Sequence, residues 1–184
     1  MKEKLLDAGQ TMVQDRGLNA VSFQDLANAV GLSKASVFHH FKSKDALAMA
    51  LLKRCQTTYG AQYAEVLAKK LPAPKKLREI TQLFETGLKN NELCLLGALG
   101  NGSGMLSKEL QAELQLTADA TIDRYKKVFD QGRREGTLTF EGSPKQAATA
   151  FLAMLQGLQV LARAQRDIAT FAKAASSYIQ SITT

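Results

Sequence analysis

Apolar residues recur every three to four positions along almost the whole chain, which is the period of a helix that buries one face. Ser, Thr or Asp precedes most of these stretches, and Gly or Pro separates many of them, as at helix ends. No segment shows the alternation typical of a strand. The sequence therefore predicts an all-α protein with helices over residues 2–16, 23–30, 33–40, 45–70, 74–90, 107–135, 144–165 and 167–182. The glycine-rich stretch 91–104 is expected to be irregular.

Composition excludes several classes of protein. A chain of 184 residues makes one or two small domains, and two cysteines are too few for a disulfide scaffold. No apolar run reaches the ~20 residues of a membrane span, and the charged N-terminus does not resemble a signal peptide. A cytoplasmic protein without membrane contact is expected. The net charge of +7 favours an anionic partner such as nucleic acid.

The stretch from Phe23 to Phe41 has the spacing of a helix-turn-helix motif. Ala27 is small enough for two helices to touch there, and Gly31, four residues later, tolerates the positive φ of a tight turn. Apolar residues spaced to fill the angle between the helices are Leu26, Val30, Leu32 and Val37. In this motif the second helix, here about residues 34–40, enters the major groove of DNA.

The residues of that second helix suit DNA recognition. Ser36 can hydrogen-bond a base edge, and Ala35 can pack against a thymine methyl. Ser22, Lys42 and Lys44 lie at helix ends or just beyond the helix, where phosphates are expected. Between residues 33 and 54, five basic residues accompany one acidic residue, a net +4. The alternative is an ordinary helical hairpin with a solvated basic face.

Two longer stretches resemble a known family. Residues 31–47, Gly-Leu-Ser-Lys-Ala-Ser-Val-Phe-His-His-Phe-Lys-Ser-Lys-Asp-Ala-Leu, are similar to the signature of TetR-family transcriptional regulators, and residues 17–27 resemble the segment that precedes it. The resemblance covers about residues 2–52. It implies a three-helix DNA-binding domain over 1–52 and a ligand-binding and dimerisation domain of about six helices over 53–184. It also implies a repressor of transcription, because most members are repressors.

The resemblance assigns a role to each position of the motif. Ser33, Ala35 and Ser36 face bases, His39 and His40 reach backbone or base edges, and Ser22 and Lys44 bind phosphates. The predicted DNA-binding residues are Ser22, Ser33, Lys34, Ala35, Ser36, His39, His40, Lys42 and Lys44. Where the family usually has a tyrosine that contacts phosphate, this chain has Phe38. We therefore expect Phe38 and Phe41 to belong to the core.

The last two helices carry more apolar surface than one small core needs. In TetR-like proteins they form a four-helix bundle with their copies in a second subunit, which implies a homodimer on a palindromic DNA operator. The predicted interface residues are Phe151, Leu155, Leu158, Phe171, Ala175, Tyr178 and Ile179. The alternative is that these helices are buried within one subunit.

The family resemblance also implies a small-molecule effector bound among the middle helices, and few charges there favour an apolar or uncharged molecule. Candidate lining residues are Phe84, Leu88, Cys94, Leu99, Met105, Tyr125, Phe129 and Met154. Each could instead be plain core. Effector binding beside the helix over 45–70, which joins the two domains, would release the operator. Some relatives sense oxidants or electrophiles through a thiol, so Cys94 is either a sensor or a buried structural residue.

Other functions fit less well. The two histidines are adjacent, so their side chains diverge on a helix, and no cluster suggests a metal, a cofactor or catalysis. The glycines of residues 97–104 follow no strand and precede no Gly-Lys-Ser/Thr, which argues against nucleotide binding. The chain is not expected to be an enzyme. A helical module that binds protein rather than specific DNA stays open as an alternative.

Overall fold

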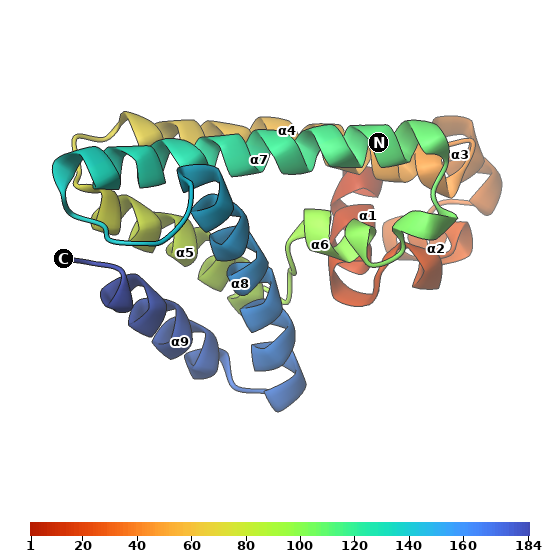
Figure 1. Cartoon of the computed structure of the whole chain (residues 1–184). Helices are drawn as coiled ribbons and strands as arrows, with labels where there is room; N and C mark the ends of the chain where they lie inside the picture. Colours follow the sequence, from red (N-terminus) through yellow and green to blue (C-terminus); the bar gives the residue numbers. More distant parts are fainter. The chain divides into compact units, whose positions relative to one another are not determined.

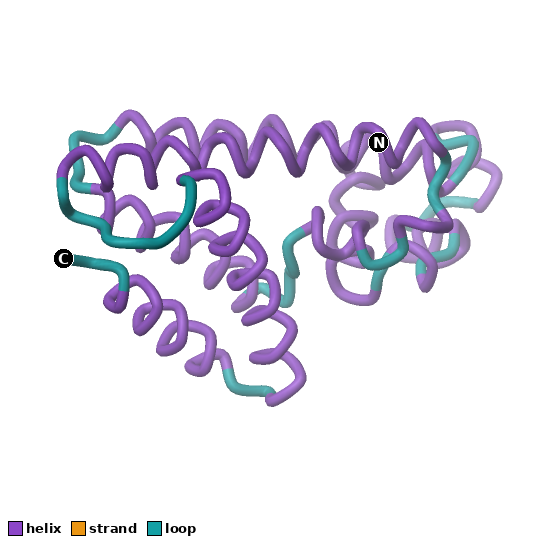
Figure 2. Tube along the Cα trace, viewed as in Figure 1, coloured by secondary structure: helices purple, strands orange, loops and turns teal.

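The computed structural model describes all residues, Met1 to Thr184, and is all-α, as predicted (Figures 1 and 2). Two short 3-10 turns, Leu18–Ala20 and Ser103–Met105, interrupt the sequence of helices. One isolated β-bridge pairs Leu138 with Thr183. The nine helices are α1 (Lys2–Arg16), α2 (Phe23–Val30), α3 (Lys34–His40), α4 (Lys44–Ala68), α5 (Ala73–Lys89), α6 (Leu95–Gly100), α7 (Lys108–Glu135), α8 (Pro144–Gln165) and α9 (Ile168–Ser181).

The helices begin and end where the caps predict. The Ser143 hydroxyl accepts a hydrogen bond from the Gln146 backbone N–H at 3.2 Å, and Pro144 occupies the first turn of α8. Asp167 caps α9 in the same way, through the Ala169 N–H at 2.9 Å. These local bonds satisfy backbone donors that would otherwise lack partners in the first turn of a helix.

The prediction of an irregular stretch over residues 91–104 is wrong. It contains α6 and the 3-10 turn Ser103–Met105. Leu95 and Leu99 lie one turn apart on α6 and are both buried, so tertiary packing stabilises a helix that is too short and too rich in glycine to be recognised from its sequence.

The chain divides into two compact units. The N-terminal unit contains residues 1–58 and 91–117, and the C-terminal unit contains residues 59–90 and 118–184. The N-terminal unit therefore contains the whole of α1, α2, α3 and α6, together with the first parts of α4 and α7. The segment 91–117 belongs to this unit although it lies beyond the predicted domain boundary at residue 52. The functional division into 1–52 and 53–184 stays a prediction.

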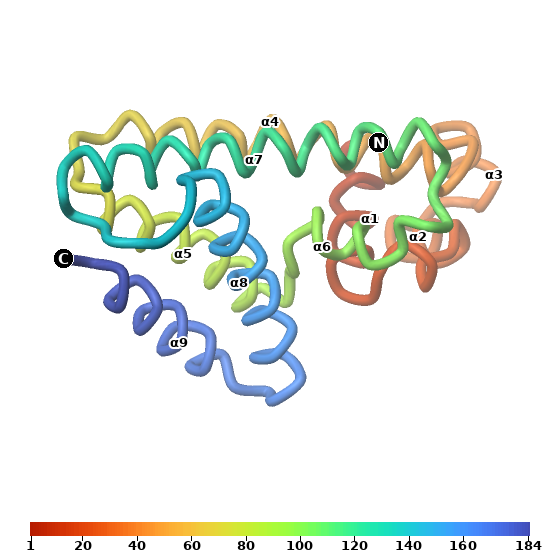
Figure 3. The backbone as a smooth tube through the Cα atoms, viewed as in Figure 1, coloured from red at the N-terminus to blue at the C-terminus, as the bar shows by residue number.

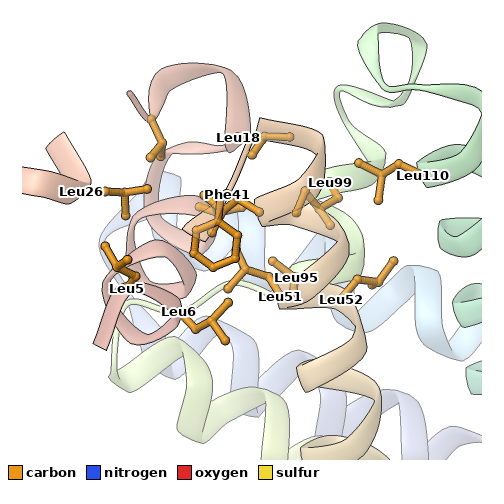
Figure 4. Close-up of a cluster of buried hydrophobic side chains, with 14 of the residues drawn as sticks. Leu5, Leu6, Leu18, Leu26, Phe41, Leu51, Leu52, Leu95, Leu99 and Leu110 are labelled. Atoms are coloured by element: carbon orange, nitrogen blue, oxygen red, sulfur yellow. The ribbon is translucent and has the colours of Figure 1, made fainter. Parts of the chain in front are cut away.

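The core of the N-terminal unit joins residues that are far apart in the sequence (Figure 4). Leu5 of α1, Phe41 after α3 and Leu51 of α4 are at most 2% exposed, and Leu95 and Leu99 of α6 belong to the same cluster. Burying a leucine or phenylalanine side chain contributes roughly 1.5–3 kcal/mol each. This shared core fixes α6 against the helices of the N-terminal motif.

The C-terminal unit packs α8 against α9, with α5 in contact with both (Figure 3). Edge-to-face aromatic contacts fill its centre: Tyr125 of α7 lies 5.4 Å from Tyr63 and 5.8 Å from Phe151, between ring centroids. Helix α8 is long and apolar enough to cross a membrane by length and composition alone. This is weak evidence for a membrane span, because the core helix of a soluble protein passes the same test, and seven residues of α8 are buried in this core.

Candidate nucleic-acid interface

The turn between α2 and α3 has the geometry of a helix-turn-helix motif. Gly31 adopts the left-handed conformation, with φ 69° and ψ 35°, where a side chain would be strained. The backbone N–H of Leu32 then donates to the Ala27 carbonyl at 2.9 Å and closes the turn. Ala27 and Val37 have no exposed surface and pack the two helices together.

A capping box fixes the N-terminus of α2. The Asp25 N–H donates to the Ser22 hydroxyl at 3.1 Å, and the Ser22 N–H donates to the Asp25 carboxylate at 2.9 Å. The Ser22 backbone N–H and hydroxyl, with the charges of Arg16 and Lys44, hold the pKa of Asp25 below its usual value. Arg16 also forms an ion pair with Asp25 at 3.2 Å. Ser22 itself is exposed at the start of the helix, where a phosphate oxygen can bind.

A pair of serines opens the recognition helix α3. The Ser33 hydroxyl accepts from the Ser36 N–H at 3.1 Å, and the two hydroxyl oxygens are 2.9 Å apart. The cap therefore holds the Ser36 side chain in one orientation on the first turn of α3. In this motif, that first turn is the part that meets base edges.

Two lysines near α3 form no ion pair within the protein and can therefore bind phosphate. Lys34 and Lys42 are exposed and take part in none of the seven ion pairs of the structure. The acidic side chains nearby are engaged: Asp25 with Arg16, and Asp45 with the Ser107 backbone N–H at 2.7 Å. The surface of the motif therefore carries positive charge that its own acids do not neutralise.

The structure brings the predicted DNA-binding residues together on one motif, and none of them is buried. Lys44 is the most constrained, because its ammonium donates to the Asn19 carbonyl at 2.9 Å while keeping two further donors. The rings of His39 and His40 lie edge to face, 5.6 Å apart between centroids. Their contacts with DNA stay predictions.

The expectation for the two phenylalanines is half right. Phe41 is 2% exposed and belongs to the core, as predicted. Phe38 is 43% exposed, so its placement in the core is wrong. The apolar side of α3 is already filled by Val37 and Phe41, and the helical spacing turns Phe38 outward.

The predicted effector-binding residues do not form one group. Phe84, Leu88, Tyr125, Phe129 and Met154 lie in the C-terminal unit, whereas Cys94, Leu99 and Met105 lie in the N-terminal unit. Leu99 is part of the core shared with α1, and Met105 is 78% exposed, with its sulfur accepting a hydrogen bond from the Asn19 amide at 3.4 Å. Whether these residues line one effector site stays a prediction.

The predicted dimer-interface residues need a larger correction. Five of them are at most 1% exposed within this single chain, so they have no surface to offer a partner: Phe151, Leu155, Phe171, Ala175 and Ile179. They pack inside the C-terminal unit, which was the alternative that the sequence left open. Leu158 and Tyr178 are half-buried. The apolar side chains that remain exposed on α8 are different ones, above all Val160 at 58% and Leu161 at 52%.

Sequence analysis also missed residues that tie the 91–117 segment to the motif. Gln14 of α1 is 2% exposed and donates from its amide to the Leu93 carbonyl at 2.7 Å. Asp45 reaches the N-terminus of α7 through Ser107. One signal in the sequence could have indicated this connection. Gln14 is a polar residue on the apolar side of its helix, and a buried amide needs a hydrogen-bond partner elsewhere in the chain.

The motif, its basic surface and the helical C-terminal unit define a helix-turn-helix DNA-binding protein. The model of the family described as "Bacterial regulatory proteins, tetR family" matches residues 5–51. Residues 5–51 are therefore similar to the DNA-binding domain of this family, and the chain is a DNA-binding transcriptional regulator.

Individual relatives agree with this assignment. The chain is 27% identical over 178 residues to the HTH-type transcriptional repressor NemR of Escherichia coli, covering 90% of this chain and 85% of NemR. A crystal structure of a TetR-family regulator from Agrobacterium tumefaciens matches with a TM-score of 0.93 and 26% identity, over 100% of this chain and 97% of that one. The reduced form of E. coli NemR shares the fold, with a TM-score of 0.81, 24% identity and coverage of 100% and 97%.

Proposed function

We propose that the protein is a cytoplasmic, dimeric repressor that binds a palindromic DNA operator and leaves it when a small molecule binds. The observation that carries the proposal is the surface of α3. Lys34 and Ser36 on α3 and Lys42 just after it are accessible, while the neighbouring acids Asp25 and Asp45 are engaged by an ion pair with Arg16 and a hydrogen bond from the Ser107 N–H. This surface offers hydrogen-bonding and cationic groups to base edges and phosphates together.

The dimer is proposed to form through the outer face of α8. Ala150, Ala153, Gly157 and Val160 are exposed and follow one another at intervals of three or four residues, and the exposed Leu161 lies four residues after Gly157, so they share one side of the helix. A Cβ atom added to Gly157 would meet no atom of this chain within 4 Å. Small residues beside large apolar ones allow a second helix to approach closely. A two-fold axis would then place two recognition helices about 34–36 Å apart, one turn of DNA.

Effector control is proposed to act through α4. This helix contributes residues 44–58 to the N-terminal unit and residues 59–68 to the C-terminal unit. The effector is expected among the apolar side chains of the C-terminal unit, near Phe84, Tyr125 and Phe129, and to be apolar or uncharged. A coupling free energy of about 1–3 kcal/mol changes operator affinity roughly 5- to 150-fold.

The first test is selection of bound duplexes from random DNA at ~150 mM salt, where non-specific attraction is weakened. An enriched palindrome supports the proposal. With that operator, Lys42→Ala is expected to weaken binding to all sequences and to reduce the salt slope by about one, whereas Ser36→Ala relaxes preference at one base pair. Lys75→Ala, an exposed lysine on α5, is the matched control and leaves both unchanged. A protein that binds no sequence preferentially would favour a protein-interaction module instead.

The dimer has its own test. Leu161→Glu places a charge on the proposed interface, and Leu116→Glu places one at an apolar position of α7 that is 63% exposed. Both side chains are exposed in the chain, so both variants are expected to fold. Sedimentation is expected to show a monomer for Leu161→Glu and a dimer for Leu116→Glu and the wild type. Identical masses for the two variants would contradict the proposed face.

A second candidate is a repressor that responds to oxidants or electrophiles through Cys94. Cys94 is half-buried, and burial together with the smaller influence of Cys94 raises the pKa of the Cys55 thiol. Operator binding by Cys94→Ser and Cys55→Ser is then compared with and without hydrogen peroxide. Loss of the response in Cys94→Ser alone favours this candidate. A peroxide response retained in both variants counts against it.

A further inference from the structure

Phe38 is the one large apolar side chain that α3 exposes, with 43% of its surface accessible. A phenyl ring in water on a basic, polar helix gains nothing for the fold from its exposed part. Lys34 and Ala35 precede it by four and three residues and are also exposed. Side chains at this spacing share one face of a helix, so Phe38 lies on the face that carries proposed DNA contacts, one turn further along.

The ring is also held in place. It packs edge to face on Phe23, with centroids 4.8 Å apart and planes at 74°. Phe23 is the first residue of α2, directly after the exposed cap Ser22, and is itself only 6% exposed. This contact fixes Phe38 from one side and leaves the rest of its ring facing outward. An aromatic side chain that is already ordered loses little conformational entropy on binding.

The chemistry of the ring selects what it can contact on DNA. Phenylalanine has no hydroxyl or amine, so it cannot bind a phosphate oxygen or form a hydrogen bond with a base edge. In the major groove, the apolar group that distinguishes one base pair from another is the C5-methyl of thymine. We propose that Phe38 reads a thymine methyl in each half of the operator. The proposal deepens the proposed function and rests on the placement of α3 in the major groove.

Uracil replacement tests the contact on the wild-type protein. Each thymine of the selected operator is replaced in turn by uracil, which removes the methyl and keeps the base pairing. Losing one buried methyl is expected to weaken binding about fourfold per half-site, and about fifteenfold when both symmetric positions are changed. The Phe38→Ala variant is expected to bind equally well to two operators that differ only by thymine or uracil at the position that Phe38 contacts. Phe38→Leu keeps apolar contact and is expected to retain part of the difference.

The controls separate this contact from others. Ala35→Gly removes the other methyl-contacting candidate and is expected to affect a different base pair, leaving the Phe38-dependent one unchanged. If Phe38→Ala fails to fold, Phe38→Leu and the uracil scan of the wild type still decide. The proposal is overturned, while the repressor function stands, if no thymine of the operator behaves in this way, that is, if no replacement by uracil weakens the wild type more than the Phe38→Ala variant. A uniform loss with Phe38→Ala on all sequences, as for a contact with deoxyribose, overturns it too. Failure to select any operator overturns both.

Discussion

Ser22 combines two roles that one pair of substitutions separates. Its hydroxyl caps α2 by accepting the Asp25 N–H at 3.1 Å, and it is exposed where we expect a DNA phosphate. Asparagine and aspartate are both good N-caps and have nearly the same shape. Ser22→Asn and Ser22→Asp therefore differ mainly by one negative charge.

The cap accounts for the expected stability. Replacing an N-cap serine by alanine costs about 1 kcal/mol, so Ser22→Ala is expected to lower the free energy of unfolding by that amount. Ser22→Asn and Ser22→Asp are expected to stay within about 0.5 kcal/mol of the wild type. The new carboxylate in Ser22→Asp lies three residues from Asp25, a like-charge pair that costs a few tenths of a kcal/mol. The Arg16 guanidinium, 3.2 Å from Asp25, offsets part of this repulsion.

Charge accounts for the expected affinity. Two unit charges about 4 Å apart interact by about 1 kcal/mol in water and about 4 kcal/mol at the effective dielectric near a protein surface. Because Ser22 is exposed, we take the lower part of this range, about 1–2 kcal/mol per subunit. Ser22→Asp is then expected to bind the operator at least tenfold more weakly than Ser22→Asn, with the difference shrinking as salt is raised.

Two measurements are combined. Urea unfolding, monitored by circular dichroism, gives the stability, and fluorescence anisotropy of labelled operator gives the affinity at roughly 50, 100 and 200 mM salt, around the concentration at which the Debye length is about 10 Å. Equal operator affinity of Ser22→Asn and Ser22→Asp would refute a phosphate beside this cap. Loss of stability in both variants, equal to that of Ser22→Ala, would refute the capping role instead.

Three further substitutions test the packing. Gly60→Ala is expected to stabilise the protein by about 0.5–1 kcal/mol because its Cβ meets only an arginine tip at 3.5 Å, whereas Gly132→Ala is expected to destabilise it by about 1–3 kcal/mol because its Cβ falls 2.3 Å from the Leu138 side chain. Thermal unfolding of the two variants compares them directly. Gln14→Met removes the donor to the carbonyl of the half-buried Leu93 and is expected to cost about 1–3 kcal/mol in urea unfolding. Burial raises the pKa of Cys55 to about 12, so the folded protein keeps a proton that the unfolded chain releases near pH 9. Stability is therefore expected to fall between pH 9 and 12, by up to about 1.4 kcal/mol per pH unit, and to fall less steeply in Cys55→Ala.

Local signals in the sequence were sufficient for the N-terminal motif. Gly31 and the caps Ser22 and Ser33 act on neighbouring backbone groups, so their effects do not depend on the rest of the chain. The two-helix geometry followed from these residues and from the small Ala27. The placement of Phe38 did not follow, because helical spacing alone does not show which of two adjacent aromatic residues the core has room for.

The proposed interface on α8 shows the limit of amphipathic patterns. This helix is apolar on more than one side, and the sequence gives no sign of which side its own chain covers. Phe151 and Leu155 are covered by the C-terminal unit itself. Gly157, Val160 and Leu161, closer to the end of the helix, stay exposed although Leu161 is as large as Leu155. The apolar surface that stays exposed in the folded chain, rather than the number of apolar residues in the sequence, indicates where a second subunit can bind.

The segments that form the N-terminal unit bear on how the proposed binding of an effector would change operator affinity. Residues 91–117 share a core with α1 and α4, the buried Gln14 holds the Leu93 carbonyl, and Asp45 holds the N-terminus of α7 through Ser107. A change in the 91–117 segment that breaks the bond between Gln14 and Leu93 removes a hydrogen bond from a side chain that is only 2% exposed, which costs about 1–3 kcal/mol. That is the size of a useful allosteric coupling free energy. The reading motif is therefore sensitive to this segment through particular hydrogen bonds as well as through the continuous helix α4.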